Sequence, residues 1–126
     1  MKKCVSTDKA PAAVGPYSQA VWAGDFLYCS GQIPLDPATG AMVGTTAKEQ
    51  AVQVLENVEG VLVSQGLSMG HVVKATVFAT DMKDFAEVNA VYAAKFAAEP
   101  PARSFVQVAG LPKGALVEIE VVAWRG

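Results

Sequence analysis

The segment ALVEIEVVAW, residues 115–124, reads as a strand whose two faces differ in character. Successive side chains of a strand point to opposite faces of the sheet, so every second residue shares a face. One face is entirely apolar, and the other carries Glu118 and Glu120 among apolar neighbours. Helices that cover the apolar face would therefore leave the mixed face open. The apolar face consists of Val117, Ile119, Val121 and Ala123.

Segments upstream of this strand supply the rest of a sheet. Residues 2–6 (KKCVS) are expected to form a short first strand, and residues 20–31 a hairpin around Gly24-Asp25. Residues 71–80 (HVVKATVFAT) are rich in β-branched side chains, which favour strands. Residues 101–108 (PARSFVQV) are the strand that precedes residues 115–124.

Two helices separate these strands. Thr46 followed by Glu49 is a capping-box pattern, and Gly66 suits the C-terminal end of the same helix. A second helix is expected to begin near residues 81–84 and to run to about Phe96. The element order is β-ββ-α-β-α-ββ, which predicts an α+β domain with both helices on one face of the sheet.

The length of 126 residues predicts a single domain over residues 1–126, and the composition favours its association with copies of itself. Hydrophobic residues make up 52% of the chain and charged residues only 17%, which is more apolar than an average domain. Two helices can cover only one face of the sheet, so the open mixed face needs another subunit. We therefore predict a homo-oligomer.

Charge and residue counts disfavour several classes of function. The net charge is −2 and the basic residues are scattered, so no basic stripe is available for nucleic acid. No apolar run is long enough for a membrane span, and the N-terminal residues lack the apolar region of a signal peptide. The single histidine, His71, excludes any triad or metal site that needs two. Cys4 and Cys29 have neither metal nor redox spacing, so we expect reduced thiols in a cytoplasmic protein.

Arg103 is unusual because it lies inside a predicted strand and the chain has only two arginines. One interpretation is structural: if strands 101–108 and 115–124 pair, Arg103 could form an ion pair with Glu118 or Glu120. The other interpretation is functional. A guanidinium presents a planar fork of donors that matches a carboxylate, so a lone arginine on a rigid strand suits a small carboxylic acid.

Polar residues at three other places allow two readings each. Asn89 falls within the apolar stripe of the second helix, where it could bond to a loop backbone or face a cleft. Ser30 and Gly31 follow a strand, where they could simply end it or allow close approach of another chain or a ligand. Tyr17 is either a packed loop aromatic or a hydroxyl at the mouth of a cleft.

Four segments, in this order and spacing, resemble the RidA/YjgF family, the reactive intermediate deaminases, which also carry the label translation inhibitor or L-PSP endoribonuclease. The resemblance covers nearly the whole chain. The segments are APAAVGPYSQAV (10–21), YCSGQIPLDPATG (28–40), VFATDMKDFAEVNAVYAAKF (77–96) and PPARSFVQVAGLPKGALVEIEVVA (100–123).

The resemblance implies a chorismate-mutase-like (YjgF-type) fold with a six-stranded mixed sheet, assembled as a homotrimer with clefts between subunits. It also implies hydrolysis of small 2-imino acids, derived from 2-aminoacrylate or 2-aminocrotonate, to 2-keto acids and ammonia without cofactor or metal. That activity is 2-iminobutanoate/2-iminopropanoate deamination. The alternatives are a keto-acid-binding regulatory trimer without turnover, an endoribonuclease and a holdase chaperone.

Matching the motifs residue by residue assigns roles to individual side chains. By resemblance, Arg103 binds the substrate carboxylate and Glu118 orients the attacking water. Many members have a cysteine two residues after the arginine, where this chain has Phe105, so we expect an altered cleft or substrate preference. The remaining cleft residues implied by the resemblance are Tyr17, Ser30, Gly31 and Asn89.

Overall fold

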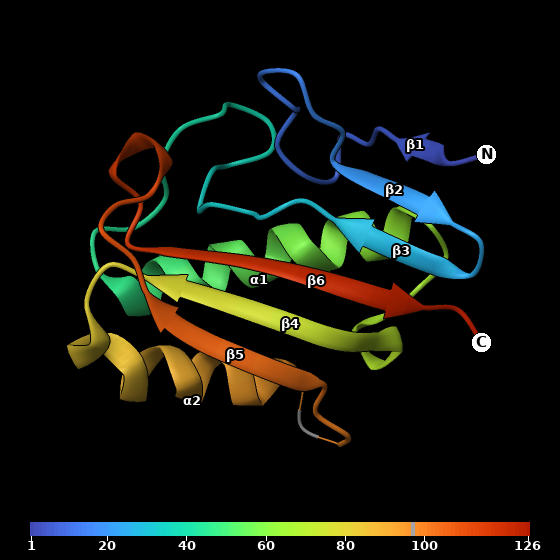
Figure 1. Ribbon diagram of the computed structural model, residues 1–126. Coiled ribbons are helices and arrows are strands. Elements are labelled where there is room, and N and C mark those ends of the chain that lie inside the picture. Colours follow the sequence, from blue (N-terminus) through green and yellow to red (C-terminus); the bar gives the residue numbers. More distant parts are fainter. Residues whose placement is uncertain (97) are drawn as a thin grey trace.

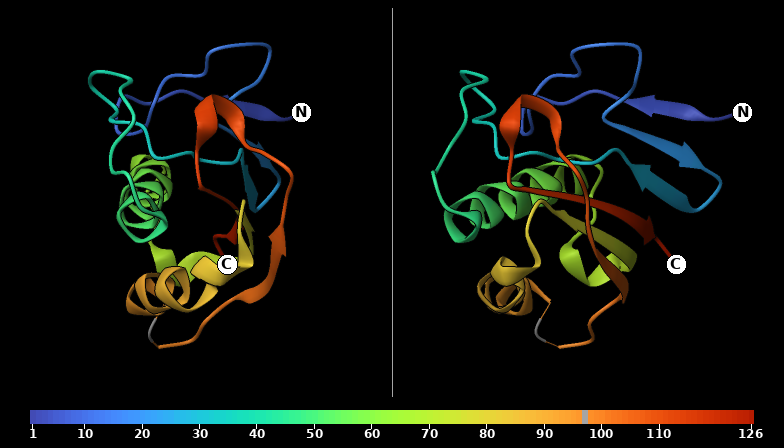
Figure 2. Two further views of the ribbon diagram at one scale, coloured as in Figure 1. Left: turned by 90° about the vertical axis from the view of Figure 1, so that its left-hand side faces the viewer. Right: turned by 60° about the vertical axis from the view of Figure 1, so that its left-hand side comes forward.

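The computed structural model of the protein describes residues 1–96 and 98–126. A single sheet of six strands runs through it in the order β1-β2-β3-β6-β4-β5 (Figure 1). The predicted element order and the α+β class are confirmed, and both helices lie on one face of the sheet (Figure 2). The strands are β1 (Lys3–Val5), β2 (Ala20–Ala23), β3 (Phe26–Cys29), β4 (Val72–Ala79), β5 (Ala102–Gln107) and β6 (Val117–Trp124).

Strand β4 lies between β5 and β6, which corrects one expectation. Residues 101–108 and 115–124 do not pair, because β6 pairs antiparallel with β4 on one edge and β5 pairs parallel with β4 on the other. The helix between β4 and β5 explains this placement. A strand–helix–strand crossover returns the chain parallel to its starting strand, so β5 takes the free edge of β4.

Helix α1 (Ala47–Ser64) forms as its end signals predict. The Thr46 side chain accepts a hydrogen bond from Glu49 N, and the Glu49 side chain accepts one from Thr46 N, which completes the capping box. At the other end Gly66 adopts a φ of +74°, the left-handed conformation that glycine tolerates best. Its apolar stripe is buried and consists of Val54, Leu55, Val58, Val61 and Leu62.

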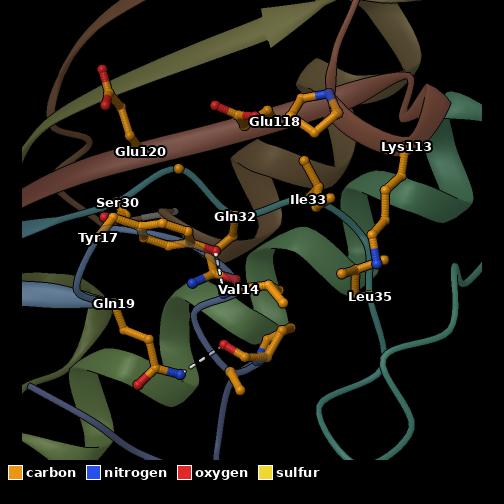
Figure 3. Close-up of a pocket in the computed structure, with 14 residues that line it drawn as sticks. Val14, Tyr17, Gln19, Ser30, Gln32, Ile33, Leu35, Lys113, Glu118 and Glu120 are labelled. Carbon is orange, nitrogen blue, oxygen red and sulfur yellow. Dashed lines mark hydrogen bonds between the residues drawn. The ribbon is translucent and has the colours of Figure 1, made fainter.

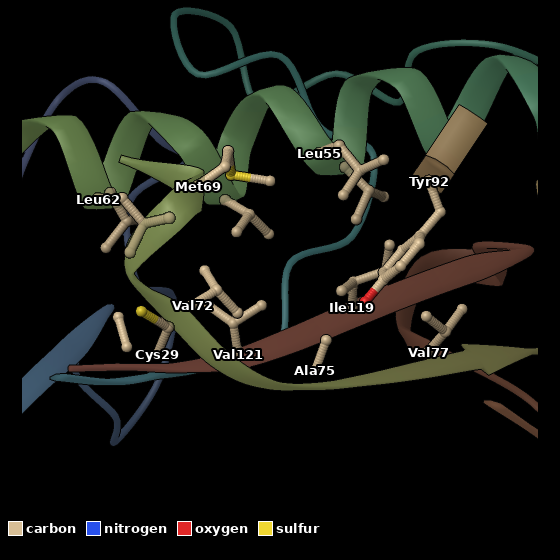
Figure 4. Close-up of a cluster of buried hydrophobic side chains, with 14 of the residues drawn as sticks. Cys29, Leu55, Leu62, Met69, Val72, Ala75, Val77, Tyr92, Ile119 and Val121 are labelled. Carbon is tan, nitrogen blue, oxygen red and sulfur yellow. The ribbon is translucent and has the colours of Figure 1, made fainter. Parts of the chain in front are cut away.

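Helix α2 (Phe85–Lys95) begins later than expected, because Met82–Asp84 form a separate 3-10 turn. Val88 and Tyr92 are its buried residues. Figure 4 shows Tyr92 reaching from this helix into the apolar cluster between the helices and the sheet. The predicted apolar face of β6 lies in the same cluster, so the core is the layer between the helices and one face of the sheet.

The opposite face of the sheet is uncovered in the single chain and carries large apolar side chains. Tyr28 is 50% exposed and Trp124 is 48% exposed, with Phe26 and Val106 also exposed. This is the surface that the sequence predicts for contact with another subunit, and self-association remains a prediction. Among the described residues, no helix is long and apolar enough to cross a membrane.

Candidate functional site

A pocket of about 510 Å³ lies beyond the end of β3 (Figure 3). Its lining comes from β6 and from the loops before β2, after β3 and before β6. It brings together four of the residues predicted from the sequence, which are Tyr17, Ser30, Gly31 and Glu118. The other residues that line it are Pro11, Ala12, Val14, Gln19, Gln32, Ile33, Leu35, Pro112, Lys113 and Glu120.

Glu118 and Gly31 are placed against each other by an extension of the sheet. Beyond β3, Gln32 N donates to Ile119 O at 2.9 Å and Ile119 N donates to Gln32 O at 3.2 Å. This bridge lays the Ser30–Gln32 backbone along β6. A Cβ added at Gly31 would lie 2.8 Å from Cδ of Glu118 and closer still to its Oε2. The partner that needs the space at Gly31 is thus the Glu118 carboxyl group.

The surroundings of Glu118 favour its protonated form more than water does. Burial raises the pKa of the Glu118 carboxyl, and the nearby Glu120 carboxylate raises it further. Glu118 and Glu120 are two residues apart on the open face of β6, and both line the pocket. A carboxyl group whose pKa moves toward neutrality is suited to exchange protons with water or a ligand.

Ser30 and Tyr17 are tied to the loop that precedes β2. Ser30 Oγ donates to Ser18 O at 2.6 Å, so its proton is already used and its free lone pairs can only accept. Tyr17 Oη accepts a long bond from Val14 N at 3.4 Å. Tyr17 is 51% exposed and lines the pocket.

Arg103 lies elsewhere, between β5 and α2, within a group of aromatic rings. Its Cζ is 4.8 Å from the ring centroid of Tyr92, 5.6 Å from that of Phe105 and 5.8 Å from that of Phe85. Nη1 donates to Asn89 Oδ1 at 2.7 Å. Asn89 therefore bonds to Arg103 rather than to a loop backbone, and the other guanidinium N–H groups have no hydrogen-bond partner among the described residues.

Phe105 packs against α2 instead of standing free. Its ring lies 4.7 Å from that of Phe85, centroid to centroid. A second hollow of about 430 Å³ lies beside Arg103 on this side of the sheet. It is lined by Asn89, Tyr92, Ala93, Phe96, Pro100, Pro101 and Arg103.

Within one chain, the structure separates the predicted site into two groups. Arg103 pairs with Ala75, which pairs with the buried Val121, so Arg103 is on the helix-covered face. Glu118 pairs with Phe78 on β4. Glu118 lies three residues before Val121 on the same strand, so its side chain projects from the opposite, open face. The ion pair considered for Arg103 and Glu118 or Glu120 is therefore wrong, since β4 separates the strands.

Gln19 and Lys113 are two of the lining residues that the sequence did not indicate as site residues. Gln19 is 3% exposed and bonds to the loop before it. A polar residue directly before a strand was its only signal. Lys113 lines the pocket with a φ of +57°, the single non-glycine residue with positive φ in the described part of the chain.

Cys29 is not a reactive thiolate, and the described residues hold no metal-ligand cluster. Burial raises the pKa of the Cys29 thiol to about 12, so it stays protonated near neutrality. In the part of the chain that the structure describes, no three His, Cys, Asp or Glu side chains gather as metal ligands. The pocket can hold a small polar molecule against a carboxyl group and backbone.

Comparisons with known proteins agree over the whole chain. The family model described as Endoribonuclease L-PSP matches residues 7–125. The 2-iminobutanoate/2-iminopropanoate deaminase of Salmonella typhimurium is 51% identical over 128 residues, covering 99% of each chain.

Solved structures show the same arrangement. A putative endoribonuclease from Thermotoga maritima superposes with a TM-score of 0.96 at 51% identity, covering 100% of this chain and 99% of the other. The TdcF protein of E. coli, solved with bound serine, has a TM-score of 0.94 at 46% identity, covering 98% and 99%. The fold, the family model and these full-length similarities together show that the chain belongs to the RidA/YjgF family.

Proposed function

We propose that this protein hydrolyses small 2-imino acids to 2-keto acids and ammonia, in clefts between the subunits of a homotrimer. The observation that carries the proposal is the partly buried Glu118 carboxyl group, which lies against Gly31 in a pocket that Ser30 and Tyr17 also line. Relatives about half identical to this chain are named for this reaction.

The reaction needs an anchor for the substrate carboxylate, and Arg103 suits that role. Its guanidinium has five N–H donors, of which one is donated to Asn89. The rings of Tyr92, Phe85 and Phe105 limit its rotation, so the free donors are already oriented before a ligand arrives. A fixed carboxylate fixes the neighbouring imine carbon as well.

Glu118 then acts on water. As a carboxylate it accepts a proton from the water that adds to the imine carbon, and a C–O bond forms while the C=N double bond becomes single. Glu118 returns that proton to the nitrogen of an imine that binds in its protonated form. The carboxylate then accepts the remaining hydroxyl proton as the C–N bond breaks, the C=O bond forms and ammonia leaves. A carboxyl group with a raised pKa holds and returns a proton more readily than an ordinary glutamate does.

The proposal includes assembly because Arg103 and Glu118 of one chain project from opposite faces of its sheet. A cleft that contains both would take Glu118, Gly31, Ser30 and Tyr17 from one subunit and Arg103 with Asn89 from its neighbour. The exposed apolar side chains on the open face support such an assembly, since they would be buried in it. Two carboxylates in the pocket oppose binding of an RNA backbone.

The test is a coupled assay. A PLP-dependent threonine dehydratase generates the imine, semicarbazide traps it, and release of 2-ketobutyrate is followed with and without the protein. We expect the wild type to restore the rate against the trap, Arg103→Ala to abolish the effect, and Arg103→Lys to impair it because an ammonium lacks the planar fork.

Two results would contradict the proposal. Full turnover by Arg103→Ala would remove the arginine from the site. Tight binding of 2-ketobutyrate by a wild-type protein that never restores the rate would instead favour a keto-acid-binding protein without turnover.

A further inference from the structure

The segment Thr7–Tyr17 forms one wall of the pocket without being a helix or a strand. It contributes Pro11, Ala12, Val14 and Tyr17 to the lining. Its internal hydrogen bonds are short-range, such as Tyr17 N to Gly15 O at 2.9 Å and Lys9 N to Thr7 Oγ1 at 3.1 Å. Bonds of this range shape a turn but do not hold it against the rest of the molecule.

The side chain of Gln19 makes the connection to the body of the protein. Its Nε2 donates to Pro11 O at 2.7 Å, to Thr7 O at 3.0 Å and to Ala10 O at 3.2 Å. Its Oε1 accepts from Thr7 N at 2.7 Å. Figure 3 shows the amide at the edge of the pocket, directed at the backbone of this wall.

Gln19 is itself fixed to the sheet next to the reacting groups. The backbone carbonyl oxygen of Gln19 accepts a hydrogen bond from Ser30 N at 3.0 Å, and Ser30 Oγ donates to the adjacent Ser18 O at 2.6 Å. One buried amide thus joins the strand end that carries Ser30 and Gly31 to the wall that carries Tyr17.

A second contact fixes the same segment against helix α1. A Cβ added at Gly60, inside α1, would lie 2.9 Å from the carbonyl carbon of Lys9 and closer still to its oxygen. Glycine inside a helix is less favourable than alanine. The close passage of the Lys9 backbone over α1 accounts for this glycine.

We propose that Gln19 is a positioning residue that fixes the Thr7–Tyr17 segment, and with it Tyr17, as the wall of the pocket. Its kinetic consequence rests on the proposed function, whereas its structural consequence does not. The amide has two N–H donors, one of them shared between two of the three carbonyl groups, and an oxygen that accepts from Thr7 N.

The decisive variant is Gln19→Glu, which keeps the size of the side chain and removes its donors. A carboxylate at this place would face three carbonyl oxygens. We expect faster amide hydrogen exchange in residues 7–17 while α1 exchanges as in the wild type. The Kd for 2-ketobutyrate and the KM for the imine should each rise about tenfold, with kcat changed much less.

Gly60→Ala is the second variant, because it displaces the segment without altering Gln19 and does not weaken the helix. It should shift exchange and affinity in the same direction. The matched control is Gln50→Glu. Gln50 is another buried amide, 4% exposed, that donates to Gly44 O and accepts from Leu116 N, and it does not line the pocket. It should lose stability without a change in KM.

The outcomes separate the two proposals. The inference fails if the amide hydrogens of residues 7–17 exchange no faster in Gln19→Glu than in Gln50→Glu. It also fails if Gln19→Glu and Gln50→Glu raise KM equally, because Gln19 is then only a structural residue. If the wild type hydrolyses no imine, the proposed function fails, and hydrogen exchange still decides the role of Gln19.

Discussion

A single missing methyl group at position 31 makes room for the carboxyl group of Glu118. Because an added Cβ would overlap that group, Gly31→Ala must move either the Ser30–Gln32 backbone or the Glu118 side chain. We expect a loss of kcat/KM of about 100-fold, the scale of a displacement of roughly 1 Å at a reacting group. The coupled dehydratase assay measures it.

Gly110→Ala is the control for this prediction. A Cβ at Gly110 meets no atom within 4 Å, so this variant should keep wild-type kinetics. Wild-type kcat/KM in Gly31→Ala would show that the position of Glu118 does not limit the reaction.

The environment of Glu118 also predicts an effect on stability. Replacing this side chain should stabilise the folded protein at alkaline pH, although the same replacement should abolish activity. The pKa of Glu118 is raised in the folded protein, so the native state binds this proton more tightly than the unfolded chain does. Its contribution is therefore favourable below the ordinary glutamate pKa and is lost as pH rises through the raised value. Glu118→Gln should unfold at higher urea concentration than the wild type at about pH 8 and show no such gain at about pH 3.5.

The exposed Glu56 on α1 provides the matched substitution, Glu56→Gln. If both variants respond to pH alike, the environment of Glu118 is not special.

At the scale of elements, α2 and β5 together hold the guanidinium of Arg103. Asn89 contributes a neutral acceptor to that contact. Asn89→Asp would replace it with a carboxylate, which competes with a ligand for the same donors. We expect Asn89→Asp to weaken 2-ketobutyrate binding more than Asn89→Ala does, by isothermal titration calorimetry. The reverse order would mean that Arg103 does not bind the keto acid carboxylate.

The sequence was sufficient to predict the helices and strands, but not to predict which strands pair. The Thr46–Glu49 capping box, the alternation of β6 and the turn at Gly24 are local signals, and each formed as expected. Alternation tells which face a side chain occupies, but not which strand lies alongside. The pairing of β4 with both β5 and β6 is a long-range choice, although the strand–helix–strand order around α2 was a usable signal for the parallel pair.

The same limit applies to the candidate site. Motifs identified Arg103 and Glu118 as single residues, and the structure puts them on opposite faces of one sheet. Gln19 could not be found by pattern, because its role depends on carbonyl groups of a loop whose path is not periodic.

At the scale of the whole molecule, the proposed cleft can be tested by mixing. Arg103→Ala and Glu118→Gln should each be inactive alone. If each cleft takes Arg103 from one subunit and Glu118 from its neighbour, random co-assembly in equal amounts restores about a quarter of the clefts. Co-expression with distinct affinity tags followed by the imine assay measures this recovery.

A mixture of Arg103→Ala with the double variant Arg103→Ala/Glu118→Gln is the control, since no cleft in it can be complete. Recovery no greater than in this control would place both residues of a working site in one chain.

The two tryptophans report on different parts of the molecule. Trp22 is partly buried, with its indole N–H donated to Gln65 Oε1 at 2.8 Å, whereas Trp124 is 48% exposed on the open face of the sheet. An indole that leaves water emits at shorter wavelength. In a Trp22→Phe protein, Trp124 would be the only source of tryptophan fluorescence. Its emission maximum, followed on dilution, would report whether the open face is covered, with no label or enzyme assay.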